Sequence, residues 1–146
     1  MKYTDRIIPE LKELEAKKYA LSSIPERLKT LELSFINIKA TDYDTDRVSG
    51  GGENRKEAAL ISTIAEMDLL KQEMEITQRQ VSSLEDALAK LSCEQRRVLE
   101  LFFIKPEKNK VDRLCEELNC EVATVYRIKN AALIELSRRL YGQVTL

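Results

Sequence analysis

Apolar residues recur along residues 57–91 in alternating steps of three and four, which is the spacing of a helical seam. A 3.5-residue repeat that is sustained over several heptads predicts a coiled-coil helix. Four further apolar residues widen the face and indicate more than one partner surface: Ile61, Ile64, Leu69 and Ile76. The seam itself consists of Leu60, Thr63, Met67, Leu70, Met74, Thr77, Val81, Leu84, Leu88 and Leu91.

Residues 1–40 carry a similar heptad-like seam, in which Lys18 occupies one position. Ser23 and Glu26 have the spacing of a capping box around Pro25, so we expect a kink or a restart near residues 22–25. The simplest arrangement is an antiparallel helical hairpin with the helix over 57–91. The apolar members of this seam are Ile7, Leu11, Leu14, Leu21, Ile24, Leu28, Leu31, Phe35 and Ile38.

Residues 41–56 interrupt both seams with Asp, Thr and Ser and with the run Gly50-Gly51-Gly52. These residue types favour turns and flexible linkers. A phosphate-binding P-loop is not indicated, because no Lys-Ser follows the glycines and no strand precedes them. We therefore expect a flexible glycine-rich linker between the two helices.

Residues 92–146 predict three further helices, the first of which opens with a capping box formed by Ser92 and Gln95. Pro106 is expected to end this first helix. The inner apolar surface of the module is expected to join this helix to the two that follow it. That surface comprises Val98, Leu99, Phe102, Phe103, Leu114, Leu118, Val125, Ile128, Ala132, Leu133 and Leu136.

The second and third of these helices are separated by only three residues, Asn119, Cys120 and Glu121. Asn tolerates the positive φ that a sharp turn needs, and a small Cys side chain fills a buried corner. Glu121 falls at the N-cap of the next helix, where its charge suits the positive helix end. Two short helices with such a joint are typical of a helix-turn-helix.

Composition supports an all-α fold, because the chain of 146 residues has 34% charged residues, four glycines, three prolines and 5% aromatics. The net charge of −1 excludes a global field that attracts nucleic acid, so DNA binding would need a local patch. From Ser92 onward, ten Lys and Arg stand against eight Asp and Glu, which is a modest positive excess.

The chain contains no histidine and three cysteines, Cys93, Cys115 and Cys120. A histidine-based catalytic dyad is excluded, and the cysteine spacing is not that of a zinc site. No nucleophile elbow or glycine-rich strand-to-helix motif is present, so we expect neither an enzyme nor a cofactor. Free thiols, no signal peptide and no apolar run of about 20 residues favour a cytoplasmic protein that does not span a membrane.

Four short motifs resemble the fourth region of bacterial sigma-70 factors, the module that reads the upstream promoter element. They are Leu-Ser-x-Glu-x-Arg-x-Val-Leu at 91–99, Leu-Cys-Glu-Glu-Leu-Asn-Cys at 114–120, Thr-Val-Tyr-Arg-Ile-Lys at 124–129 and Ala-Leu-Ile-Glu-Leu at 132–136. The whole chain is similar to small sigma-70 region 4-like proteins of phages and prophages of Firmicutes. Those proteins place a coiled coil before this module and are thought to regulate phage late genes.

The resemblance implies that residues 92–146 form a three-helix DNA-binding module whose last helix meets the bases. The first two exposed positions of that helix are usually polar or charged in sigma factors, whereas this chain has Val and Ala there, so the family's promoter sequence is not carried over. Phosphate contacts are expected from Lys108, Lys110, Arg113, Thr124 and Lys129. The matching base-facing positions are Val122, Ala123, Tyr126, Arg127 and Asn130.

The sequence therefore predicts a sequence-specific regulator of transcription that binds double-stranded DNA. Its coiled coil is expected to form a homodimer or to recruit a partner, with RNA polymerase as a candidate by analogy with sigma region 4. No second sigma region is recognisable, which argues against a complete initiation factor. Two alternatives stay open: a phage small terminase subunit that binds packaging-site DNA as a ring, and a protein-interaction adaptor without DNA binding.

Overall fold

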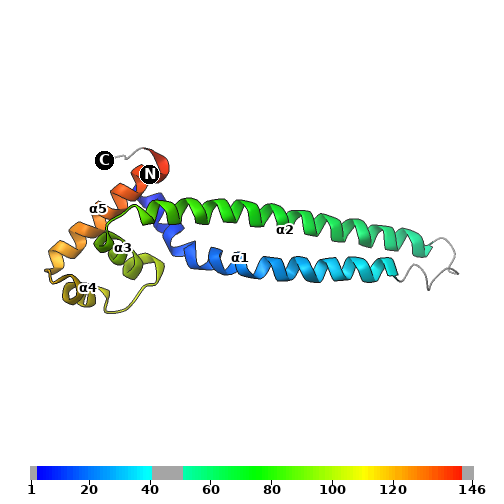
Figure 1. Cartoon of the computed structure of the whole chain (residues 1–146), viewed down its shortest axis with the longest axis horizontal. Helices are drawn as coiled ribbons and strands as arrows, with labels where there is room; N and C mark the ends of the chain where they lie inside the picture. Colours follow the sequence, from blue (N-terminus) through cyan, green and yellow to red (C-terminus); the bar gives the residue numbers. More distant parts are fainter. Residues whose placement is uncertain (1–2, 41–50, 143–146) are drawn as a thin grey trace. The chain divides into compact units, whose positions relative to one another are not determined.

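The computed structural model describes residues 3–40 and 51–142 and is all-helical over these ranges (Figure 1). The predicted all-α class is confirmed, and no strand occurs among the described residues. No helix within 3–40 or 51–142 combines the length and the apolar character needed to cross a membrane. The elements are α1 (Tyr3–Ala40), α2 (Gly51–Ala89), α3 (Cys93–Leu99), the π-helix η1 (Glu100–Ile104), α4 (Lys110–Leu118) and α5 (Val122–Tyr141).

The chain divides into two compact units, and the two long helices contribute to both. Unit 1 contains residues 1–18 and 79–146, and unit 2 contains residues 19–78. The start of α1 and the end of α2 therefore belong to the same compact unit as the three C-terminal helices. The sequence alone placed residues 92–146 in a module of their own.

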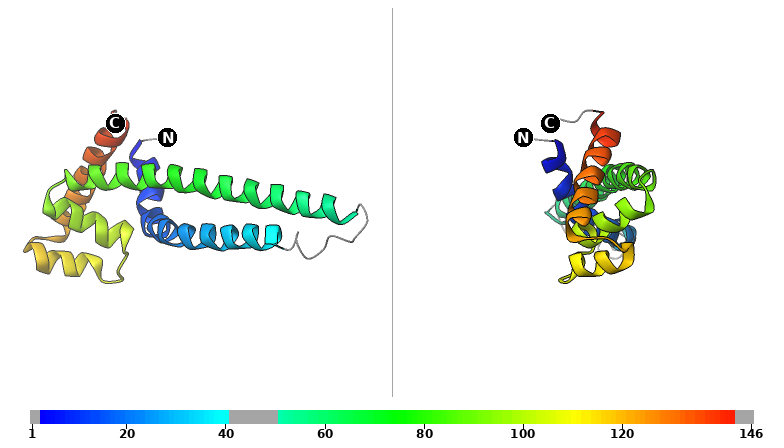
Figure 2. Two further views of the ribbon diagram at one scale, coloured as in Figure 1. Left: turned by 45° about the vertical axis from the view of Figure 1, so that its right-hand side comes forward. Right: turned by 90° about the vertical axis from the view of Figure 1, so that its left-hand side faces the viewer.

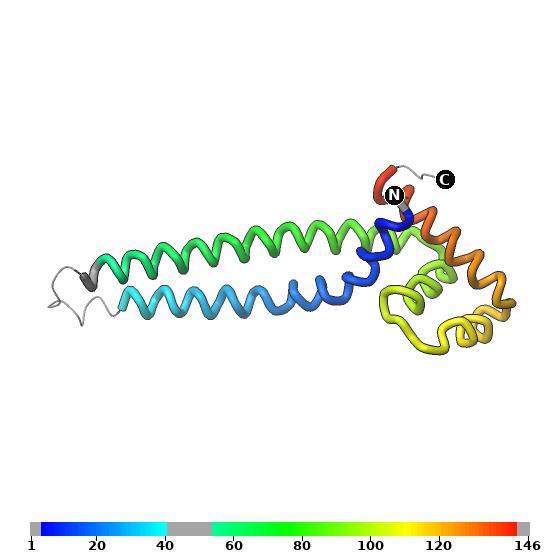
Figure 3. The backbone as a smooth tube through the Cα atoms, turned by 180° about the vertical axis from the view of Figure 1, so that it is seen from behind, coloured from blue at the N-terminus to red at the C-terminus, as the bar shows by residue number. Residues whose placement is uncertain are grey.

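In unit 2, α1 and α2 lie side by side and run in opposite directions (Figures 1 and 3). The seam positions face inward: Ile24, Thr63 and Leu70 are buried, and the other seam residues of this unit are half-buried. The burial of side chains at alternating three- and four-residue steps follows from the helical period. The additional apolar residues Ile61 and Leu69 remain exposed on α2.

The expected restart of α1 near residues 22–25 is wrong, because α1 is one helix from Tyr3 to Ala40. The hydroxyl of Ser23 donates to the carbonyl of Ala20 at 3.1 Å and does not cap a new helix. Ser22 donates in the same way to the carbonyl of Tyr19 at 2.7 Å. Serines that bond backward to the preceding turn are compatible with a helix interior, so the capping-box spacing was misleading here.

The expected linker over 41–56 is wrong for its last six residues, because α2 begins at Gly51. Residues 53–58 read Glu-Asn-Arg-Lys-Glu-Ala, and most of these residue types are good helix formers that outweigh the two preceding glycines. The rest of the expected linker, residues 41–50, lies outside the described residues.

In unit 1, the three C-terminal helices pack around a small apolar core (Figure 2). The core joins Val98 of α3, Leu101 of η1, Leu114 of α4 and Val125 of α5. The Ser92 capping box is confirmed: Gln95 N–H donates to Ser92 Oγ at 3.2 Å, and Ser92 N–H donates to Gln95 Oε1 at 3.3 Å. The half-buried residues packed against the core are Phe102, Cys115, Leu118, Cys120 and Ile128.

A π-helical turn replaces the expected end of the first helix, with the N–H of Lys105 donating to the carbonyl of Glu100 at 2.8 Å. The wider turn changes which side chains face the core. Leu101, which is not among the residues expected to face inward, is fully buried, whereas Phe102 and Phe103 are only half-buried. The helical segment ends at Ile104, just before Pro106, as expected from the proline.

The N-terminal turns of α1 supply a further part of the unit 1 core. Ile7, Leu11 and Leu14 are buried there, as are Leu84 and Leu88 at the end of α2. The hydroxyl of Tyr141 in α5 donates to Glu10 Oε1 at 2.8 Å. The guanidinium of Arg6 lies over the Tyr141 ring, 5.4 Å from its centroid. The end of α5 is thus fixed to the start of α1.

Candidate nucleic-acid interface

The joint between α4 and α5 has the backbone conformation that the sequence predicts. Asn119 adopts φ 52° and ψ 52°, the left-handed region that Asn tolerates better than most residues. The N–H groups of Asn119 and Cys120 both donate to the carbonyl of Cys115, and the bond from Cys120 is 3.2 Å long. The helix end is thereby satisfied, and α5 leaves α4 after only three residues.

Glu121 occupies the N-cap of α5 in extended conformation, as expected, but its side chain makes no capping hydrogen bond. Its carbonyl accepts the N–H groups of Thr124 at 3.0 Å and Val125 at 3.2 Å, which starts the helix. The first turn of α5 is thus bonded to the backbone of Glu121 and not to its side chain.

The base-facing positions expected from the resemblance lie together on one exposed face of α5. The side chain of Val122 is 50% exposed and that of Tyr126 is 42% exposed. Ala123, Arg127 and Asn130 are also exposed. Spacings of three and four residues connect all five along one side of the helix. The opposite side carries Val125 and Ile128, which pack on the core as predicted.

Two lysines from different helices converge on the ring of Phe102. Lys110 Nζ, from the first residue of α4, lies 5.1 Å from the ring centroid, and Lys129 Nζ of α5 lies 5.4 Å from it. The Tyr126 ring meets Phe102 edge-on, with centroids 5.8 Å apart, and Lys129 Nζ lies 5.1 Å from the Tyr126 centroid. Cation–π contacts of this kind hold ammonium groups close to an aromatic surface. The sequence predicts both lysines as phosphate contacts. Nothing in it indicates that both lie over the same aromatic ring.

Arg113 differs from the two lysines because its guanidinium already forms ion pairs with two carboxylates. Its guanidinium donates to Glu107 Oε1 at 2.7 Å and to Glu117 Oε1 at 3.1 Å. Hydrogen bonds to Glu107 and Glu117 raise the pKa of Arg113 above its usual value. A phosphate would therefore compete with two carboxylates for the Arg113 guanidinium. Lys108 is exposed, and Thr124 is half-buried.

Glu117 links α4 to α3 as well, through two hydrogen bonds of 2.9 Å from the Arg97 guanidinium. Arg97 also donates to Glu100 at 3.3 Å. The hydrogen bonds from Arg97 and Arg113 lower the pKa of Glu117 to about 2. This ion-pair network fixes the orientation of α4 on α3 and leaves the α5 face uncovered.

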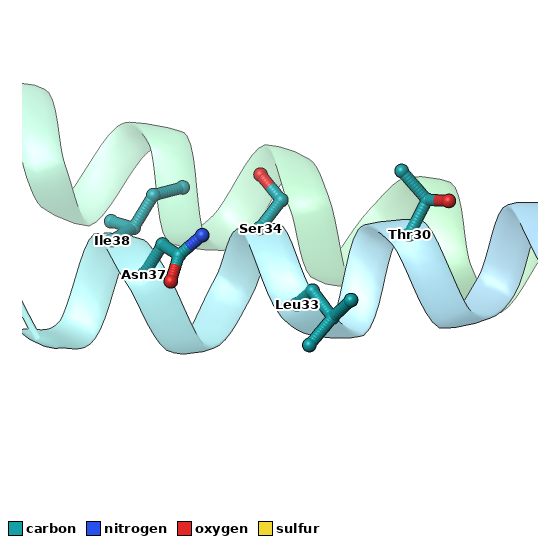
Figure 4. Close-up of a pocket in the computed structure, with 5 residues that line it drawn as sticks. All are labelled: Thr30, Leu33, Ser34, Asn37 and Ile38. Atoms are coloured by element: carbon teal, nitrogen blue, oxygen red, sulfur yellow. The ribbon is translucent and has the colours of Figure 1, made fainter.

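Other surface features offer less to a ligand. A shallow groove of unit 2 is lined by Thr30, Leu33, Ser34, Asn37 and Ile38, all from α1 (Figure 4). Its lining contains no charged side chain. The three cysteines are free thiols, and within the described residues no group of three His, Cys, Asp or Glu is placed to hold a metal ion.

No curated protein and no solved structure matches this chain. One family model does match, over residues 37–137, and its description is a protein of unknown function, DUF1492. The matched segment runs from the end of α1 through α2 and the joint to most of α5, which is well over half of the 146 residues. The chain therefore belongs to the DUF1492 family.

Proposed function

We propose that α3, α4 and α5 form a sigma-70 region 4-like helix-turn-helix and that the protein is a sequence-specific DNA-binding regulator of transcription of the phage or prophage type. The observation that carries this proposal is the exposed α5 face from Val122 to Asn130 beside the Lys110 and Lys129 ammonium groups. An α-helix of this kind fits the major groove of B-DNA.

The chemistry of each side chain on this surface determines whether we expect it to contact a base or a phosphate. Arg127 can pair bidentately with guanine, and Asn130 can do so with adenine, because both are exposed on the face that would meet base edges. Lys110 and Lys129 lie at the edge of that face on the Phe102 ring, where they would contact phosphates. Tyr126, packed edge-on against Phe102, would be held in place before DNA arrives.

The near-neutral chain is consistent with a specific binder of this design. A net charge of −1 gives no long-range attraction to DNA, so affinity must come from the local cluster and from base contacts. Arg113 would have to exchange its ion pairs with Glu107 and Glu117 for a phosphate, so we expect a smaller contribution from it than from the two lysines.

The hairpin of α1 and α2 would supply the second activity of a regulator, which is self-association or recruitment of a partner. Ile61, Leu69 and Ile76 of α2 are exposed outside the seam, as is Leu33 of α1. Burying these side chains against a partner would remove apolar surface from water, which is the driving force for such an interface. We propose a homodimer, because a dimer presents two α5 helices to a paired DNA site. RNA polymerase is the candidate partner by analogy with sigma region 4.

The test is the mass of the full-length protein in solution, alone and with duplex DNA from its own gene neighbourhood. The proposal expects a dimer that binds one short fragment with a steep salt dependence. A monomer that binds in this way would keep the DNA-binding proposal and overturn the homodimer. A ring of eight or more subunits would instead favour the small terminase subunit. A protein that binds no fragment at any salt concentration would be an adaptor, and the DNA-binding proposal would be wrong.

A further inference from the structure

The exposed face of α5 begins with two side chains that cannot form hydrogen bonds. Val122 is the first residue of the helix and is 50% exposed, and Ala123 beside it is also exposed. Three residues further on in the helix, Val125 is fully buried in the core. Val122 is therefore left outside the core of the module, although its side chain is as apolar as that of Val125.

The edges of the base pairs in the major groove carry hydrogen-bond donors, acceptors and a single kind of apolar group, the C5 methyl of thymine. Apolar side chains at the leading end of a recognition helix have no other complementary group to meet there. We infer that Val122 and Ala123 read thymine methyl groups, so that the target site of this protein contains thymine where the start of α5 meets it. This inference rests on the proposed function and adds the base that these two residues specify.

The surroundings of the two residues fix where such a contact would occur. Arg127 lies on the same face, about one helical turn after Val122 and Ala123, and can hydrogen-bond a neighbouring base. Lys110 and Lys129 lie at the edge of the face on Phe102, and phosphate contacts from them would fix the register of the helix. A methyl contact would then fall at one or two defined positions of the site and not along its whole length.

The N-cap strengthens the argument, because the Glu121 side chain makes no hydrogen bond to the first turn. The first turn of α5 thus presents its apolar side chains without a polar capping group folded across them.

The experiment replaces each thymine of a bound duplex in turn with deoxyuridine, which removes only the methyl group and keeps base pairing. For the wild-type protein we expect affinity to fall about 3- to 5-fold at one or two positions, from the loss of one buried methyl each. Val122→Ser should bind thymine and uracil duplexes equally at its position. Ala65→Ser, which changes an exposed residue of α2 in unit 2, should keep the wild-type preference.

Two results would overturn the inference while DNA binding stands: uracil is tolerated at every position, or Val122→Ser keeps the full thymine preference. Absence of binding to any duplex would instead overturn the proposed function and this inference with it. Because Val122 is exposed, its variant should unfold at the wild-type temperature, which separates a lost contact from a lost fold.

Discussion

The hydroxyl of Tyr141 donates a hydrogen bond of 2.8 Å to Oε1 of Glu10, which is 131 residues away in the sequence. The bond joins the last turn of α5 to the second turn of α1, beside the buried residues Ile7 and Leu11. The helix that we propose to read DNA is therefore anchored at its far end by the N-terminus of the chain. A change in the start of α1 is expected to reach α5 through this contact.

Tyr141→Phe should lower the free energy of unfolding by about 1 kcal/mol, because it removes one half-buried hydrogen bond. Burial and the bond to Glu10 raise the pKa of Tyr141 from 10.0 to about 12. A raised pKa gives stability that is present below pH 10 and is lost as the pH rises toward 12. The advantage of the wild type over Tyr141→Phe in chemical denaturation should therefore shrink between pH 10 and pH 12. A difference that stays constant over this range would contradict the assignment.

Glu117→Gln should destabilise the packing of α4 on α3 at neutral pH, because it weakens the bonds from Arg97 and Arg113. The pKa of Glu117 is lowered from 4.5 to about 2, so its contribution is present above pH 4.5 and is lost as the pH falls toward 2. Thermal unfolding of both proteins from pH 6 to pH 2 should show the curves converging at acid pH. Glu116→Gln, an exposed neighbour, is the matched control and should follow the wild type.

Leu101→Ala should cost about 2 to 5 kcal/mol of folding stability, the range found for a fully buried leucine. Phe103→Ala should cost less, although phenylalanine is the larger side chain, because Phe103 is only half-buried. Urea denaturation of the two variants compares these costs directly. If Phe103→Ala were the more damaging change, the π-helical register of η1 would be wrong.

Arg127→Ala should weaken binding to the specific site by about 1 to 3 kcal/mol while leaving the fold intact, because the side chain is exposed and is proposed to pair with a base. Arg138→Ala removes the same charge from the same helix, beyond the proposed reading face, and serves as the control. Fluorescence anisotropy on one duplex measures both. Equal affinities of the two variants for the duplex would show that Arg127 does not contact a base.

The double variant Lys110→Ala/Lys129→Ala should reduce the slope of log affinity against log salt concentration by about 2, since each lysine is proposed to neutralise one phosphate. The control double variant is Lys29→Ala/Lys71→Ala, which removes two exposed charges from unit 2. An unchanged slope in the Lys110 and Lys129 variant would show that these two lysines do not contact phosphates.

Periodic and local features of this protein could be read from the sequence alone. Side chains of the seam from Leu60 in α2 to Leu91 just after it are buried or half-buried, because heptad spacing fixes the inner face of a helix. The Ser92 cap and the positive φ of Asn119 were also predicted, since each depends on a few neighbouring residues. The exposed α5 positions followed from Val125 and Ile128 facing inward.

Features that depend on distant residues or on competing local bonds could not be read in this way. The Ser23 hydroxyl bonds to the preceding turn of a continuous α1 and does not cap a new helix. The π-helical turn places Leu101 in the core. No periodicity indicates that Glu10 meets Tyr141, or that Phe102 gathers lysines from two helices. The pairing of Arg113 with Glu107 likewise required the folded loop between η1 and α4.

The central claim is that α5 reads a DNA sequence, and its most direct test is selection of bound duplexes from a random pool by the full-length protein. We predict enrichment of one motif that contains thymine, with the enrichment lost in Arg127→Ala and retained in Arg138→Ala. Selection that yields no motif, or the same motif with both variants, would contradict the claim.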